Sequence, residues 1–157
     1  MEKTANQIKY ENYKEQSKRM NSAMNKGFYL EALFIEYAII EDRTESVLRH
    51  AGKWEPYLKK RGRYDPTLNS KVDYIRKVKD SNRKDLLNKY FSNELLDSII
   101  TWKEDRNRLI HALLKQKLEH NEIKSIAEQG KLLVDEIKKN SGKYNSAIDK
   151  RIDKCML

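Results

Sequence analysis

The segment NELLDSIITWKEDRNRLIHALLKQKLE, residues 93–119, decides the fold class of this chain. At about 100° per residue, one sector of its helical wheel collects apolar side chains: Leu95, Ile99, Trp102, Leu109, Ile110 and Leu113. Neighbouring positions extend that arc with Leu96, Ile100, Leu114 and Leu118. Such an arc can bury one part in the core of the subunit and pair the other with a second copy. The pattern predicts a long amphipathic helix in an all-α protein.

The rest of the chain predicts further helices around this segment. Glycine (5) and proline (2) are scarce among the 157 residues, which favours long helices in a single domain over 1–157. We expect a bundle of five to six helices, including helices over about 6–25, 28–50, 70–79, 93–119 and 121–140, the last resuming after Gly142. Residues 51–70 hold both prolines and are expected to form a loop of about twenty residues.

Composition also bounds the partners and the compartment. The net charge of +9 favours nucleic acid or an acidic surface as a partner. The single cysteine, Cys155, excludes an intramolecular disulfide and a zinc site built on paired cysteines. The longest apolar stretch, Phe28–Ile40, is only thirteen residues long and carries Glu31 and Glu36, too short and too charged to span a membrane. Because Met1–Tyr10 is polar, we expect no secretory signal and a cytoplasmic protein without a membrane partner.

The expected loop over 51–70 is rich in basic and aromatic residues. Its cations are Lys53, Lys59, Lys60, Arg61 and Arg63, interleaved with Trp54, Tyr57 and Tyr64. One interpretation is an RNA-contact surface, since cations follow the phosphate backbone while aromatic faces stack on bases. The other is a solvated loop whose aromatic side chains anchor it to the body. The sequence leaves both interpretations open.

Three polar residues of the 93–119 helix lie within or beside the apolar arc. Arg106 falls in the middle of the arc, where a guanidinium is costly unless it is paired or hydrogen-bonded. Asn107 and His111 are one turn apart on the flank. Glu36, inside the apolar run of the second helix, is a candidate ion-pair partner for Arg106. His111 is interpreted either as a functional residue or as a satisfied histidine at the edge of the core.

The string Arg106-Asn107-Arg108-Leu109-Ile110-His111 resembles the signature of HEPN domains, an Arg followed by a polar residue, a short spacer and a His. Four residues separate Arg106 from His111, within the four to six typical of the family. HEPN domains are all-α bundles of about this length, with the motif late in the bundle on a long helix. A second, looser match runs from Arg43 to His50 and lacks the Asn, because Thr44 follows the Arg.

The resemblance implies a metal-independent endoribonuclease without a cofactor, of a toxin or phage-defence type. In such a reaction the 2′-hydroxyl attacks the adjacent phosphate and leaves 2′,3′-cyclic phosphate ends. A histidine can exchange the proton near neutral pH, which is the role of His111, while Arg106 binds the charged phosphate. Asn107 orients His111 or contacts phosphate, and Glu36 is interpreted as a supporting carboxylate.

The resemblance also implies partners beyond the RNA. Arg106 and His111 are five residues apart and diverge by about 140° on a regular helix, so one copy presents them poorly to one phosphate. A two-fold homodimer brings both copies together, and HEPN nucleases build a composite site in that way. An antitoxin or a nucleotidyltransferase is a further partner that the resemblance implies.

Two other classes of function stay open. A non-catalytic HEPN-like RNA-binding or protein-interaction module would keep the fold without needing Arg106 and His111. A helical DNA-binding regulator is disfavoured, because no recognition helix after a tight turn is evident. The sequence has no glycine-rich phosphate loop and no metal-ligand spacing, and its three histidines fall on different segments or faces.

Overall fold

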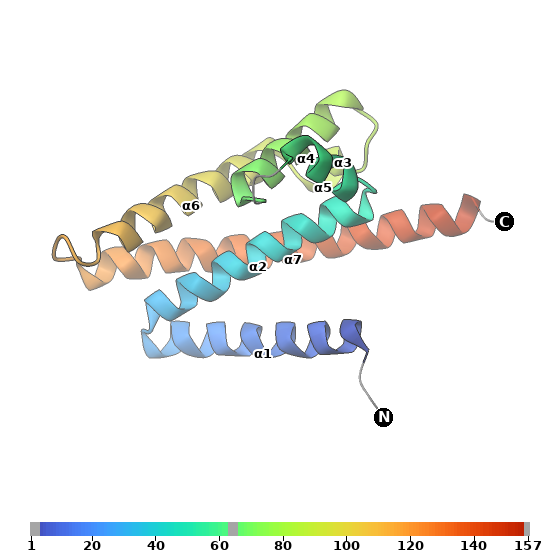
Figure 1. Ribbon diagram of the computed structural model, residues 1–157. Helices are drawn as coiled ribbons and strands as arrows, with labels where there is room; N and C mark the ends of the chain where they lie inside the picture. Colours follow the sequence, from blue (N-terminus) through green and yellow to red (C-terminus); the bar gives the residue numbers. More distant parts are fainter. Residues whose placement is uncertain (1–3, 63–65, 156–157) are drawn as a thin grey trace. The chain divides into compact units, whose positions relative to one another are not determined.

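The computed structural model describes residues 4–62 and 66–155 of the chain. Within these ranges all regular secondary structure is helical, which confirms the predicted all-α class (Figure 1). The described helices are α1 Ala5–Lys26, α2 Tyr29–His50, α3 Trp54–Arg61, α4 Leu68–Ser81, α5 Leu87–Tyr90, α6 Asn93–Ala112 and α7 His120–Cys155. These are seven helices over the described ranges, more than the five to six expected. None of the helices in the described part of the chain is long and apolar enough to cross a membrane.

The expected loop over 51–70 is wrong in its first half. Residues Trp54–Arg61 form α3, and the buried side chains of Trp54 and Tyr57 hold this short helix in place. Pro56 does not prevent the helix, because it lies in the first turn, where backbone N–H groups have no intrahelical partner. The following helix, α4, begins at Leu68 with Thr67 as its N-cap, earlier than the expected start at Ser70.

The predicted end of the 93–119 helix is also wrong, as is the predicted break at Gly142. Helix α6 ends at Ala112, and Leu114 beyond it is fully exposed. The leucines after residue 112 therefore find no core that would stabilise further helical turns. Helix α7 continues through Gly142 to Cys155 without a break, because Ser141 and Tyr144 on either side of the glycine are buried.

The chain divides into two compact units. Unit 1 comprises Met1–Ile39 and Trp102–Leu132, and unit 2 comprises Ile40–Thr101 and Leu133–Leu157. Three helices, α2, α6 and α7, contribute residues to both units. The single domain over 1–157 stays a prediction.

Unit 1 is built around a close approach of α2, α6 and α7. Its described buried apolar residues include Met20, Ala23, Ala32, Leu33, Ile35, Ile39, Trp102, Leu109, Ile126 and Ala127. The indole N–H of Trp102 donates to the carbonyl oxygen of Ile126 at 2.9 Å. Gly130 makes this approach feasible, since a Cβ there would lie 2.1 Å from Oε2 of Glu36 and 2.8 Å from Cε2 of Trp102. Any larger residue at 130 would have to displace both of these side chains.

Unit 2 contains the three short helices and a buried cation. Trp54, Tyr57, Val72, Ile75 and Phe91 are among its buried residues. The ammonium group of Lys71, on a side chain only 4% exposed, lies 3.3 Å from Oε1 of Glu41 and 3.4 Å from Oε2 of Glu45. It also lies 5.7 Å from the ring centroid of Trp54. Two carboxylates and an aromatic face therefore compensate the burial of this charge.

Candidate functional site

The strongest candidate site lies in unit 1, on the last turns of α6. Trp102 and Leu109 are buried and fix the orientation of this part of the helix. Arg106, one turn after Trp102, is half-buried. Its guanidinium carbon lies 5.0 Å from the ring centroid of Phe34 and 4.8 Å from that of Tyr37, both on α2. Two aromatic rings therefore position the cation at the edge of the core.

The guanidinium of Arg106 has no carboxylate partner among the residues that the structure describes. Its Nη1 donates to Oδ1 of Asn107 at 3.0 Å, and its buried Nε has no hydrogen-bond partner in the described ranges. Burial lowers the pKa of Arg106 from its ordinary value, and Tyr37 partly offsets that effect. The group stays charged all the same, because an arginine side chain is not deprotonated in proteins. A charge held in this way is available to bind an anion.

Glu36 is buried in unit 1 but does not pair with Arg106. Neither carboxylate oxygen has a hydrogen-bond partner among the described residues, and the side chain packs at Gly130 and Trp102. Burial raises the pKa of Glu36 to about 8, with a smaller opposing effect from Lys131. Glu36 is therefore mostly protonated and neutral at pH 7. The proposed ion pair between Glu36 and Arg106 is wrong, because the structure leaves both groups without that contact.

His111 lies in the last turn of α6 with its side chain exposed. It makes no hydrogen bond to another described residue, so the interpretation as a satisfied histidine at the core edge is wrong. Asn107 contacts Arg106 in this structure rather than orienting His111. An exposed imidazole without a partner can reach a substrate or a second copy of the chain.

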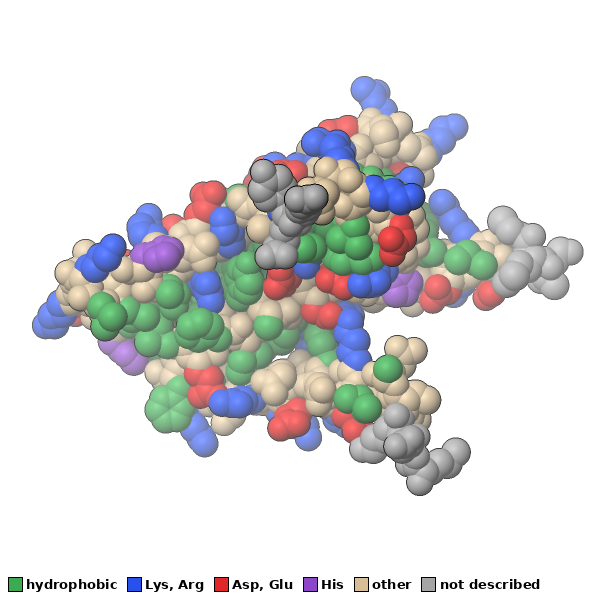
Figure 2. Space-filling model, in the orientation of Figure 1, with side chains coloured by type: hydrophobic (Ala, Val, Ile, Leu, Met, Phe, Trp, Pro, Cys, Tyr) green, Lys and Arg blue, Asp and Glu red, His purple; other side chains and the backbone are tan. Residues whose placement is uncertain are grey.

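Several large apolar side chains around the motif are exposed. Phe34, which contacts Arg106, is 54% exposed, and Leu113 and Leu114, just after His111, are 36% and 100% exposed. Exposed apolar side chains that gather around polar groups are typical of interaction surfaces. In the view of Figure 2, side chains of both charge signs lie between exposed hydrophobic ones.

The second match to the motif, Arg43 and His50 of unit 2, lacks these properties. The guanidinium of Arg43 binds the carboxylate of Asp42, with Nε at 3.1 Å from Oδ2. The Nδ1 of His50 lies 2.9 Å from the backbone carbonyl oxygen of Ser46. Both side chains therefore have local partners, and the 106–111 stretch is the better candidate.

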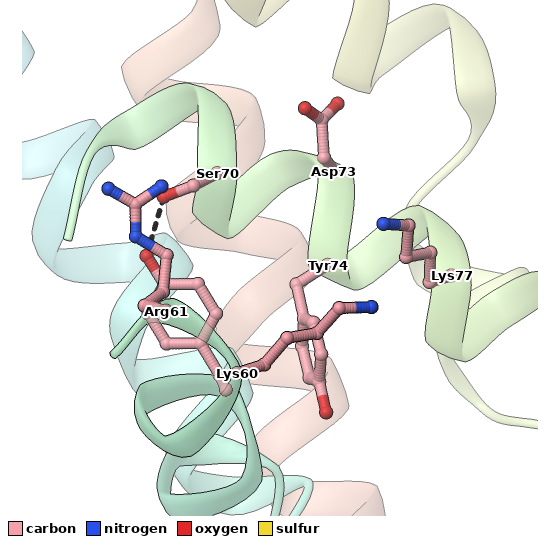
Figure 3. A pocket seen from close by; sticks show the side chains of 7 residues that line it. Lys60, Arg61, Ser70, Asp73, Tyr74 and Lys77 are labelled. Atoms are coloured by element: carbon pink, nitrogen blue, oxygen red, sulfur yellow. Dashed lines mark hydrogen bonds between the residues drawn. The ribbon is translucent and has the colours of Figure 1, made fainter. Parts of the chain in front are cut away.

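The basic residues predicted to bind RNA are separated by the structure. Lys53 precedes α3 as its N-cap residue, and Lys59, Lys60 and Arg61 occupy its last turn. Lys60 and Arg61 line a hollow of unit 2, to which Lys53 and Lys59 do not contribute (Figure 3). Arg63 lies outside the described residues.

Four residues that line this hollow were missed by the sequence analysis: Ser70, Asp73, Tyr74 and Lys77. Their spacing of i, i+3, i+4 and i+7 places them on one face of a helix. The predicted helix over 70–79 already contains all four residues, but only the structure shows that α3 lies beside this face and closes the hollow.

Comparison with known proteins and the search for metal ligands add no further site. No family model, no curated protein and no solved structure matches the chain. The resemblance of Arg106–His111 to the HEPN signature thus depends on these residues alone. Among the residues that the structure describes, no group of three or more His, Cys, Asp or Glu side chains could hold a metal ion.

Proposed function

We propose that the chain is a metal-independent endoribonuclease of HEPN type, acting as a toxin or a phage-defence effector. The observation that carries this proposal is the half-buried Arg106, which lies over two aromatic rings of α2 and has no carboxylate partner among the described residues. A structural arginine at such a position would be expected to have an acidic partner. The exposed His111 on the same helix supplies the second group that RNA cleavage needs.

In the proposed reaction, one P–O bond forms while another breaks. The 2′-oxygen of a ribose attacks the adjacent phosphorus, and the bond from phosphorus to the 5′-oxygen of the next nucleotide breaks. His111 transfers the proton, so that the products are a 2′,3′-cyclic phosphate and a 5′-hydroxyl. Arg106 stabilises the additional negative charge on the phosphoryl oxygens, and Asn107 holds the guanidinium in place.

The proposal includes a two-fold homodimer. Arg106 and His111 diverge by about 140° around α6, so the Arg of one copy and the His of the other are proposed to share one phosphate. The exposed Phe34, Leu113 and Leu114 would then be covered at the interface. An antitoxin or a nucleotidyltransferase partner is proposed on the resemblance alone.

The test is cleavage of a mixed RNA pool in the presence of EDTA by three proteins. Wild type and a His50→Ala control are expected to cleave, whereas His111→Ala is not, and the products should carry 2′,3′-cyclic phosphate ends. His50 belongs to the looser match and controls for the loss of any histidine. Equal cleavage by wild type and His111→Ala would contradict the assigned site. RNA binding without cleavage by any of the three would favour a non-catalytic binding module.

A further inference from the structure

The hollow of unit 2 lies between the faces of two helices. Its volume is about 340 Å³, and its lining residues are Tyr57, Lys60 and Arg61 of α3 with Ser70, Asp73, Tyr74 and Lys77 of α4. This volume falls near the lower end of the range for small-molecule sites. It suits one nucleotide and is too small for a duplex.

The walls of the hollow are held by contacts between the two helices. The hydroxyl of Ser70 donates to the backbone carbonyl of Thr67 at 2.8 Å and lies 2.6 Å from the hydroxyl of Tyr57 (dashed line in Figure 3). The rings of Tyr57 and Tyr74 meet edge to face, with centroids 5.4 Å apart. Because Tyr57 is only 1% exposed, it anchors this arrangement in the core. The hollow is therefore largely preformed, which lowers the entropic cost of binding.

Three cations and one carboxylate line the hollow, giving it a positive balance. Figure 3 shows the ammonium groups of Lys60 and Lys77 on one side of the hollow and the guanidinium of Arg61 on the other. Lys60 and Lys77 are exposed, so that a ligand can reach both. Cations arranged around a small hollow suit a phosphate group.

Tyr74 and Asp73 distinguish a nucleotide from a bare phosphate ion. The half-buried ring of Tyr74 leaves part of its surface accessible, and such a ring can stack on a base. The exposed carboxylate of Asp73 would repel an inorganic phosphate, but it can accept hydrogen bonds from ribose hydroxyl or base amino groups. The lining thus offers a group for each part of a nucleotide.

We propose that this hollow binds one nucleotide of a single-stranded RNA, with its phosphate at Lys60 and Lys77 and its base on Tyr74. A strand is favoured over a free nucleotide because the last turn of α3 also carries Lys59, which does not line the hollow and can contact a neighbouring phosphate. The site lies in unit 2 and does not depend on the proposed cleavage at Arg106 and His111 of unit 1.

The test measures binding of a fluorescently labelled single-stranded RNA by anisotropy, in the full chain carrying His111→Ala so that cleavage cannot interfere. In that background, Lys77→Glu is expected to raise Kd about tenfold or more. The matched control Lys84→Glu makes the same charge change at another exposed lysine of unit 2 that does not line the hollow, and it should raise Kd less than about threefold. If the two variants raise Kd equally, the proposed site is overturned, and RNA is attracted only by the general positive charge of the surface.

A second set of measurements tests the nucleotide itself. Tyr74→Leu is expected to weaken RNA binding about tenfold, and Tyr74→Phe, which keeps the ring, should retain most of it. Circular dichroism verifies that both variants are folded. If Tyr74→Leu does not fold, the variant Lys77→Glu still tests the site, because Lys77 is exposed. Uridine monophosphate should displace the labelled RNA, whereas inorganic phosphate at the same concentration should not. Displacement by phosphate alone would overturn the base contact, and free nucleotide binding as tightly as RNA would overturn the assignment to a strand.

Discussion

Lys71 and Arg106 are both cations that lie against aromatic rings, but they differ in the carboxylates around them. Lys71 in unit 2 is buried beside Trp54 and has the carboxylates of Glu41 and Glu45 within 3.4 Å. Arg106 in unit 1 is half-buried on Phe34 and Tyr37 and has only the amide of Asn107.

The comparison separates a structural cation from a functional one. The charge of Lys71 is compensated within the fold, so its role is to stabilise unit 2. The charge of Arg106 is held in place, but no carboxylate among the described residues compensates it. A positioned cation without a carboxylate is what binding a phosphate requires. Substitutions at the two positions should therefore affect different measurements.

The largest expected effect is on cleavage by Arg106→Ala. The rate of RNA cleavage in EDTA should fall about 100-fold to 1,000-fold, the range typical of losing one group that stabilises a charged transition state. Arg108→Ala is the matched control, since Arg108 is 72% exposed and pairs with Asp105 on the same helix. A loss of similar size in both variants would indicate an effect of net charge and would remove the distinction drawn for Arg106.

The next effect concerns Glu36, a buried acid without a hydrogen-bond partner among the described residues. Because its pKa is raised from 4.5 to about 8 on folding, the folded state binds the extra proton between these values. Stability therefore falls as pH rises through this range, by about 3 kcal/mol between pH 4.5 and 7. The free energy of unfolding of Glu36→Gln should lack this fall, as measured by urea denaturation at several pH values.

If the free energy of unfolding changes with pH in the same way for wild type and Glu36→Gln from pH 4.5 to 8, the raised pKa of Glu36 is contradicted. The difference between the two curves matters, because other groups titrate in both proteins. Lys131 favours the charged form of Glu36, so Lys131→Met should raise the pKa of Glu36 further, and the fall in stability should continue to a higher pH.

A smaller effect is expected for the structural cation. Lys71→Ala should lower the free energy of unfolding by about 1–3 kcal/mol, below the loss for a fully buried pair because Glu41 and Glu45 are 33% and 29% exposed. Lys71→Met should lose less, since it keeps the apolar stem in place. Cleavage per folded molecule should not change in either variant, and a selective loss of cleavage would give Lys71 a role in function.

The smallest effect is expected from the ring beneath Arg106. Phe34→Leu removes one cation–π contact, worth about 0.5–1 kcal/mol at an exposed site, while Tyr37 keeps the other. Cleavage should fall about twofold to fivefold, measured at saturating protein so that dimer formation does not limit the rate. A loss as large as that of Arg106→Ala would show that Phe34 does more than position the guanidinium.

The sequence predicted the fold class and most of the helix positions, because the spacing of buried residues is a local property of the chain. It also indicated Arg106, since a cation inside an apolar arc is visible on a helical wheel. It missed α3, whose eight residues include Pro56 and depend on burial of Trp54 and Tyr57. Tertiary contacts decide such a short helix, so its own sequence does not reveal it.

The pairing of side chains could not be predicted either. Glu36 and Arg106 are both polar residues within apolar patterns, and sequence reasoning paired them by elimination. The structure instead packs Glu36 at Gly130, 94 positions further along the chain, and Arg106 on two rings of α2. Which partner a buried polar group finds depends on the packing of helices far apart in sequence.

A mixing experiment tests the central claim, that Arg106 of one copy and His111 of another act on one phosphate. Differently tagged Arg106→Ala and His111→Ala chains are coexpressed, and dimers carrying both tags are isolated. Each such dimer would contain one intact Arg–His combination out of two, so it should cleave RNA at about half the wild-type rate while each variant alone stays inactive. Isolated mixed dimers without activity, beside an active wild type purified in the same way, would contradict a site shared between two copies.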